Sequence, residues 1–163
     1  MNRKILIISM ITLIIDQLSK SIISNIVKLG ATKQVIKDFF YLTTVHNDGA
    51  AWGIFSNQQF LITIGTIISF IIIYKFIYGF KTNTRNNVAF GLVLGGLAGN
   101  LIDRLFLGYV RDFLDFMIFG YDFPVFNVAD IGIVIGVILL IIAILKGEDV
   151  NENNSKRSKR KTG

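Results

Sequence analysis

The sequence predicts a mainly α-helical, polytopic membrane protein with four transmembrane helices, a small extracytoplasmic β-element and an outer loop. Of the 163 residues, 52% are hydrophobic, and the mean hydropathy of +0.58 is high for a globular domain. Long uncharged runs approach the ~20 residues that a helix needs to cross the hydrocarbon core. Basic residues gather where one side of a four-span protein would face the cytoplasm.

Four spans are predicted, at about 5–27, 60–80, 88–107 and 125–145. The first follows Arg3 and Lys4 and superficially resembles a signal peptide. Because no small-residue cleavage site follows it, we interpret it as a retained helix. The third span carries Gly91, Gly95 and Gly99, a spacing that predicts close helix packing in lipid.

The remaining segments are too polar to span a membrane. Residues 28–57 contain aromatic and β-branched side chains from Val35 to Val45, which favour a small strand-rich surface element. Residues 108–124 form an aromatic-rich surface segment that connects the third and fourth spans. Residues 1–146 are thus expected to be one membrane-embedded domain, followed by a basic tail, 147–163, too poor in apolar residues to fold.

The charge distribution predicts the orientation. The N-terminus, the loop with Lys81 and Arg85, and the tail lie on one side of four spans. Six basic residues from Lys146 onward decide the count, so both termini are expected in the cytoplasm and segments 28–57 and 108–124 outside. The net charge of +6 therefore favours contact with anionic membrane lipid, and we expect no nucleic-acid partner.

The residue types present limit the possible chemistry. The chain has no cysteine and a single histidine, His46. Thiol nucleophiles, thiolate metal sites and zinc sites of the His-x-x-x-His kind are excluded. Carboxylates, hydroxyls and lysines remain as catalytic groups.

Ionisable residues inside the spans are expected to have a structural or functional role, because each costs about 2.5–3.5 kcal/mol on insertion into the membrane. Asp16 and Lys20 are four residues apart and can pair, either as a structural ion pair or to position a site. Asn100, Asp103 and Arg104 follow at the outer end of the third span. They form either a structural Asp–Arg clasp or part of a functional site.

Asp112 and Asp130 give the strongest functional indication. Asp112 lies just after the third span, and Asp130 lies at the start of the fourth, three residues after Asn127. Antiparallel helices joined on the outer side would bring the two carboxylates together. Such a pair tends to share a proton and can supply a general base and a general acid. Asp115 and Asp122, in the same segment, are expected to be solvated surface acids.

Five ordered motifs then resemble the lipoprotein signal peptidases, the type II signal peptidases of bacteria. They are DQLSK at 16–20, NDGAAWG at 47–53, GGLAGNLIDR at 95–104, VRDF at 110–113 and FPVFNVAD at 123–130. By this resemblance Asp112 and Asp130 match the catalytic aspartates, which activate water without metal or other cofactor. The other matching motif positions, near the substrate or supporting the pair, are Asp16, Lys20, Asn47, Gly49, Asn100, Asp103, Arg104, Asn127 and Ala129.

The resemblance also implies the substrate and the location. The expected enzyme is an aspartic endopeptidase of the bacterial cytoplasmic membrane, with its active site at the outer face. Its substrate is a diacylglyceryl-modified prolipoprotein, cut just before the lipidated cysteine, and its inhibitor is the cyclic peptide globomycin. We expect a monomer.

Three alternatives stay open at this point. A small proton or ion transporter would also contain intramembrane carboxylates, although it would spread them through the bilayer depth. A presenilin-type protease would place its aspartates deeper and contain a Gly-x-Gly-Asp motif, which this chain lacks. A non-catalytic scaffold would leave the ordered motifs unexplained.

Overall fold

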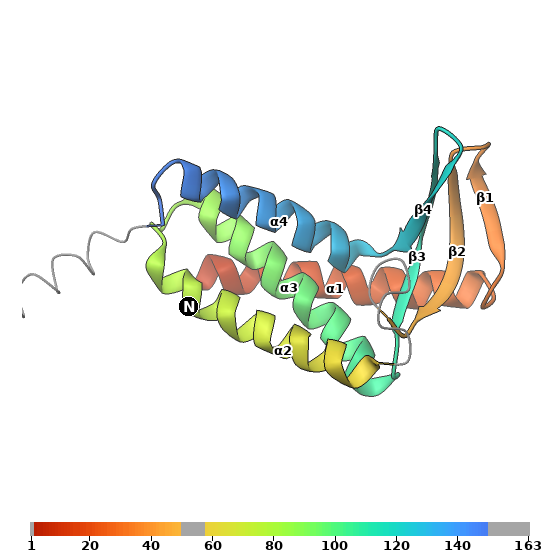
Figure 1. Ribbon diagram of the computed structural model, residues 1–163, viewed down its shortest axis with the longest axis horizontal. Helices are drawn as coiled ribbons and strands as arrows, with labels where there is room; N and C mark the ends of the chain where they lie inside the picture. The colour runs from red at the N-terminus through yellow and green to blue at the C-terminus, as the bar shows by residue number, and fades with distance from the viewer. Residues whose placement is uncertain (1, 50–57, 150–163) are drawn as a thin grey trace, which may run out of the picture.

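The computed structural model describes residues 2–49 and 58–149 of the chain. In this part a bundle of long helices carries an antiparallel sheet across one end, which we call the sheet end (Figure 1). The elements are α1 (Arg3–Ile26), β1 (Thr32–Ile36), β2 (Phe40–Asn47), α2 (Gln59–Phe76), the short 3-10 helix η2 (Ile77–Gly79), α3 (Thr84–Phe106), β3 (Val110–Ile118), β4 (Tyr121–Phe126) and α4 (Val128–Leu145). Within the described residues, four helices are long and apolar enough to cross a membrane, as predicted.

Helix α3 is the centre of the bundle and contacts α1, α2 and α4. Its glycines allow these contacts, which confirms the predicted packing. A Cβ atom on Gly95 would lie 2.6 Å from the backbone oxygen of Ser9 in α1, and one on Gly91 would lie 2.6 Å from the Ile8 side chain. The backbones of α1 and α3 therefore approach closely. Such close packing holds helices together in lipid, where the hydrophobic driving force between them is weak.

The bundle turns apolar side chains both inward and outward. Ile5, Phe80, Phe90 and Leu140 belong to a buried cluster at the end opposite the sheet. Helix α2 has no buried residue, so its isoleucine-rich surface is available to lipid. This distribution suits a bundle that is solvated by hydrocarbon.

Asparagine caps set the starts of α3 and α4. Asn83 and Asn127 each accept a hydrogen bond from a backbone N–H in the first turn, which starts α3 at Thr84 and α4 at Val128. The predicted starts at residues 88 and 125 are therefore displaced by a few residues.

The sheet contains more of the chain than predicted. Its order is β1-β2-β3-β4, with every neighbouring pair antiparallel. Segment 28–57 supplies β1 and β2, as expected, but segment 108–124, predicted as a surface loop, forms β3 and most of β4. Its residues pair with β2, for example Phe116 with Phe40, and turn back at Phe119 and Gly120.

The first residues of the predicted tail lie against the loop between α2 and α3. Glu148 pairs with Arg85 and accepts a hydrogen bond from Asn83. Its carbonyl accepts a hydrogen bond from the Lys81 N–H, at 2.8 Å. The rest of the predicted tail, residues 150–163, lies outside the described residues.

Candidate active site

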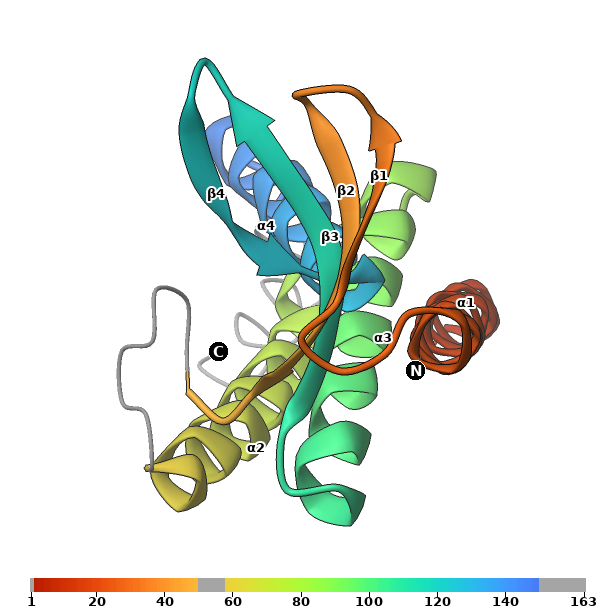
Figure 2. The same cartoon turned by 90° about the vertical axis from the view of Figure 1, so that its right-hand side faces the viewer.

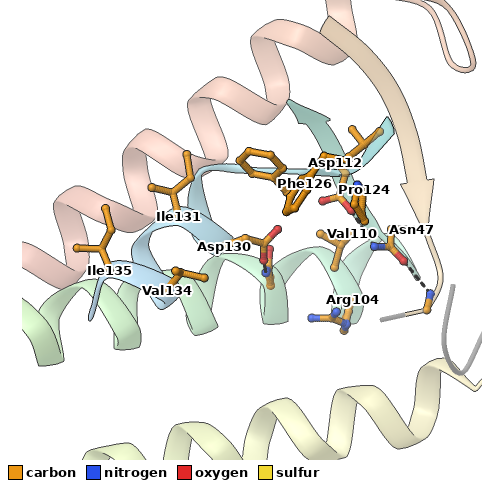
Figure 3. A pocket seen from close by; sticks show the side chains of 14 residues that line it. Asn47, Arg104, Val110, Asp112, Pro124, Phe126, Asp130, Ile131, Val134 and Ile135 are labelled. Atoms are coloured by element: carbon orange, nitrogen blue, oxygen red, sulfur yellow. Dashed lines mark hydrogen bonds between the residues drawn. The ribbon is translucent and has the colours of Figure 1, made fainter. Parts of the chain in front are cut away.

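A cavity of about 550 Å³ opens at the sheet end of the bundle (Figure 3). Its polar lining residues come from α3, β3, α4 and the end of β2, and its apolar lining comes mainly from β4 and α4. The polar residues are Asn47, Asn100, Arg104, Asp112 and Asp130; the others are Gly49, Val110, Phe123, Pro124, Val125, Phe126, Ile131, Val134 and Ile135. The two aspartates singled out in the sequence thus face one space.

Asp112 lies on β3 with its side chain almost fully buried. One carboxylate oxygen accepts a hydrogen bond from Asn47 Nδ2 at 2.8 Å, and the other accepts one from Asn127 Nδ2 at 2.5 Å. Burial and the nearby charge of Asp130 raise the pKa of Asp112 to about 7. Asp112 is therefore poised to hold a proton near neutral pH.

Asp130 lies in the first turn of α4, where Asn127 is the N-cap. Its Oδ1 accepts a hydrogen bond from Asn100 Nδ2 at 2.8 Å, and its Oδ2 accepts one from the Asn127 backbone N–H at 3.2 Å. Asn127 therefore contacts both carboxylates, one through its side chain and the other through its backbone. The capping geometry of α4 fixes the position of Asp130 relative to Asp112.

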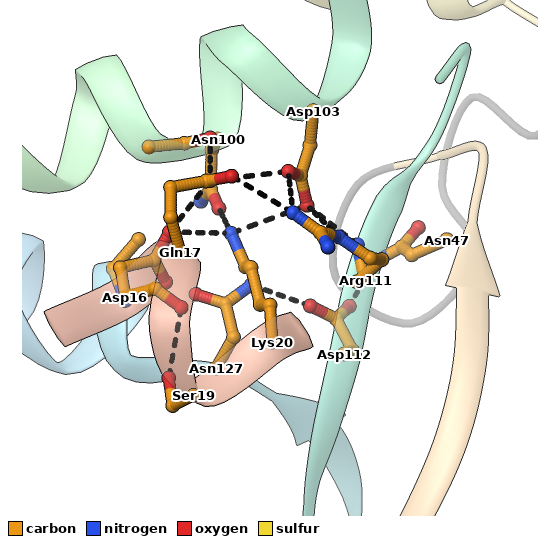
Figure 4. A network of polar contacts seen from close by, with 12 residues as sticks. Asp16, Gln17, Ser19, Lys20, Asn47, Asn100, Asp103, Arg111, Asp112 and Asn127 are labelled. Atoms are coloured by element: carbon orange, nitrogen blue, oxygen red, sulfur yellow. Dashed lines mark hydrogen bonds and ion pairs between the residues drawn. The ribbon is translucent and has the colours of Figure 1, made fainter. Parts of the chain in front are cut away.

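A buried polar network lies behind the two aspartates (Figure 4). Lys20 Nζ lies 2.8 Å from Asp16 Oδ2, 3.4 Å from Asp103 Oδ2 and 2.8 Å from Asn100 Oδ1. The predicted pairing of Asp16 with Lys20 is present, and both side chains are 0% exposed. Asp16 also accepts a hydrogen bond at 2.9 Å from the Ala129 N–H, so α1 stabilises the positive N-terminus of α4.

The ion partner of Asp103 is not Arg104. Arg111 on β3 contacts both oxygens of Asp103, with Nη2 at 2.7 Å and Nε at 3.2 Å. The interpretation of Asp103 and Arg104 as a structural clasp is therefore wrong, because adjacent residues of a helix point in different directions. Arg104 instead lines the cavity (Figure 3), and within the described residues its guanidinium forms no ion pair.

Gln17 and Arg111 belong to the network, although sequence reasoning did not select them. Gln17 Nε2 donates to Asp16, to Asp103 and to the Gly99 carbonyl, and its Oε1 accepts from Arg111 at 2.8 Å. Both residues stand inside matched motifs, DQLSK and VRDF, which was the available signal. Gly99 leaves room for the Asp16 carboxylate, which contacts the position that a Cβ atom would take.

The other predicted residues are also placed. The Gly49 N–H donates to Asn47 Oδ1 at 3.0 Å and so orients the amide that binds Asp112. Asp115 is partly exposed and also accepts a hydrogen bond from Thr43 at 2.6 Å. Asp122 is exposed, as expected. His46 stacks on Tyr109 with ring centroids 3.6 Å apart.

The geometry can support acid–base chemistry on a bound amide. Two carboxylates face one largely apolar cavity, and amide donors rather than cations bind them directly. Such an environment disfavours two negative charges and favours one shared proton. One carboxylate can then activate water while the other protonates a leaving group.

Comparison with known proteins agrees with this chemistry. The family model described as signal peptidase (SPase) II matches residues 8–146. The lipoprotein signal peptidases of Staphylococcus aureus strains JH9 and Newman are each 44% identical over 155 residues, 94% of either chain.

Solved structures give the same result. A bacterial membrane enzyme determined by the in meso method at 2.3 Å resolution has a TM-score of 0.78 and 44% identity, with 87% of each chain covered. A second, at 1.9 Å, has a TM-score of 0.76 and 44% identity, covering 87% of this chain and 92% of that one. The transporter alternative finds no support among these relatives. This chain therefore belongs to the signal peptidase II family of membrane-embedded aspartic peptidases.

Proposed function

We propose that Asp112 and Asp130 are the catalytic pair with which this signal peptidase II removes the signal peptide from diacylglyceryl-modified prolipoproteins. The observation that carries this proposal is their shared environment. Both carboxylates line one cavity, and both bind Asn127. Such an arrangement holds two acids close to one peptide bond.

The reaction requires one proton on the pair. The ionised carboxylate accepts a proton from a water molecule, whose oxygen attacks the scissile carbonyl carbon. The protonated carboxylate donates its proton to the amine of the lipidated cysteine as the C–N bond breaks. The raised pKa of Asp112 is consistent with this shared proton, which belongs to the pair rather than to either residue.

The other motif residues support the pair. Asn47, Asn100 and Asn127 donate to the carboxylates, and Gly49 orients Asn47. Behind them Asp16, Lys20, Asp103 and the Ala129 N–H fix α1 against α3 and α4. Arg104 lines the cavity, where its charge is available to a substrate carbonyl or carboxylate.

The cavity walls suit a lipidated peptide. Ile131, Val134 and Ile135 extend the cavity along the apolar surface of α4. A diacylglyceryl group on the cysteine would occupy this side, while the extended signal peptide approaches from the bilayer. The position of the site at one end of the spans matches a scissile bond near the membrane surface.

The topology and partners complete the proposal. We place both termini in the cytoplasm and the sheet end at the outer face of the bacterial cytoplasmic membrane, with the enzyme acting as a monomer and the basic tail contacting anionic lipid. Globomycin would compete with substrate for the cavity.

A gel-shift assay tests the proposed function. The purified protein is incubated in detergent with a diacylglyceryl-modified prolipoprotein and with the same precursor lacking the lipid, each with and without globomycin. We expect the signal peptide to be released from the lipidated precursor alone, and globomycin to prevent it. Absence of cleavage beside an active control enzyme would contradict the proposal.

A further inference from the structure

The free end of the sheet carries an exposed apolar cluster that the catalytic site does not use. The turns of both hairpins lie at this end, side by side (Figures 1 and 2). Around them Ile36 is 52% exposed, Phe39 46%, Ile118 40% and Phe119 104%. We call these four residues the aromatic tip.

Phe119 is the least expected residue of the tip. It has a φ of 50°, in the left-handed region that bulky side chains rarely adopt. Asparagine or glycine would adopt this φ with less strain, and neither would expose an apolar side chain to water. The side chain is fully exposed, so its contacts within the described chain do not compensate for the strain. A favourable contact outside the chain would explain it.

The position of the tip identifies the contact as the bilayer. The strands run across the bundle end, and the hairpin turns project past the side of α4 (Figures 1 and 2). On that helix Val134, Ile138 and Ile141 are half exposed, as lipid-facing residues would be. The tip therefore overhangs the leaflet that surrounds the start of α4. Interfacial segments bury phenylalanine and large aliphatic side chains at this level of a membrane.

The charges near the tip do not oppose this contact. Lys37 and Asp38 lie in the first turn, and both are exposed. Lys33 and Asp122 lie farther along the strands, so two basic and two acidic residues surround the cluster. Apolar insertion, rather than net charge, would supply the attraction.

We propose that the aromatic tip inserts into the interfacial region of the leaflet beside α4 and anchors the free end of the sheet to the membrane. Because β4 and α4 both line the cavity, this anchor holds the opening of the cavity at the level of the lipid headgroups. A membrane-embedded substrate then meets the cavity without leaving the bilayer.

Tryptophan fluorescence tests the anchor independently of catalysis. The only tryptophan, Trp52, is changed to phenylalanine, and Phe119→Trp is introduced as the probe. The protein is reconstituted in nanodiscs with and without lipids brominated near the carbonyl end of the acyl chain, and Ile68→Trp on α2 is the lipid-facing control. We expect bromolipid to quench the fluorescence of the Phe119→Trp protein at least twofold and aqueous iodide to quench it little.

Two outcomes would overturn the proposal. Strong quenching by iodide with none by bromolipid would place the tip in water. Protection from iodide that appears only when several protein copies share a nanodisc would indicate a second copy as the partner.

As a second test, Phe119→Asn should preserve the turn and the activity in detergent but slow cleavage in liposomes at least threefold, whereas Phe119→Trp should not slow it. Equal rates for Phe119→Asn and the wild type in liposomes would also count against the anchor.

Discussion

Replacing Lys20 by methionine tests whether the buried network stabilises the bundle. Lys20 is 0% exposed and is the cation between Asp16 and Asp103. Without it, two buried carboxylates lose their shared partner, and breaking a buried pair in this way costs about 3–5 kcal/mol. With a shift of about 2–4 °C per kcal/mol for a chain of this size, the unfolding midpoint should fall by ~6–20 °C.

The assay is thermal unfolding in detergent, with Lys28→Met as the matched control. Lys28 follows the same helix but is exposed, so its loss should shift the midpoint by little. The double variant Asp16→Asn/Lys20→Met removes one orphaned charge and should recover part of the loss. Equal midpoints for Lys20→Met and Lys28→Met would refute the reasoning.

Three further predictions concern the site. Because the folded-state pKa of Asp112 is raised to about 7 from 3.8, the native state holds a proton that the unfolded state has released. Stability should therefore fall as the pH rises from about 4 to about 7, by up to ~1.4 kcal/mol per pH unit for this one proton, and Asp112→Asn should reduce that slope in unfolding measured across pH. Asn127→Ala and Asn83→Ala each remove a helix N-cap, at a cost of about 0.5–2 kcal/mol in stability. Only Asn127→Ala should also lower the cleavage rate at least tenfold, and equal losses of cleavage rate in the two variants would contradict the role of Asn127. Gly99→Leu should displace Asp16 and lower both the unfolding midpoint and activity, and an unchanged midpoint would contradict the close packing.

The spans could be predicted because each is a long uncharged run, but their ends could not. Helix α3 begins at Thr84 because Asn83 caps it and because Glu148 supports the polar first turn through Arg85. Because Glu148 is far from the first turn of α3 in the sequence, its support could not be foreseen. Hydropathy alone therefore excluded the polar residues of that turn from the predicted span. Tertiary contacts decide such ends.

The meeting of Asp112 with Asp130 followed from topology, whereas their partners did not. Antiparallel spans bring the two acids to one end, and the structure places both at one cavity. The pairing of Asp103 with Arg111 depends on where β3 crosses the end of α1 and α3, and no local spacing encodes it. Sequence proximity favoured Arg104 instead, which points into the cavity.

The second half of the sheet was missed for a related reason. Segment 108–124 contains alternating aromatic residues and a Gly120 turn, yet its acids gave it the appearance of a solvated loop. In the sheet, Asp112 accepts a hydrogen bond from Asn47 and Asp115 accepts one from Thr43, both on the neighbouring strand β2. The strand becomes favourable only once these partners are present.

The most direct test of the catalytic pair compares three aspartate variants in one cleavage assay. Asp112→Asn and Asp130→Asn replace the proposed acids with neutral side chains of the same shape, and Asp122→Asn changes an exposed acid of the same hairpin. With all three proteins purified and shown to be folded, the lipidated prolipoprotein should be cleaved by Asp122→Asn at the wild-type rate and by the other two at least a thousandfold more slowly. Substantial cleavage by either Asp112→Asn or Asp130→Asn would contradict the two-aspartate mechanism.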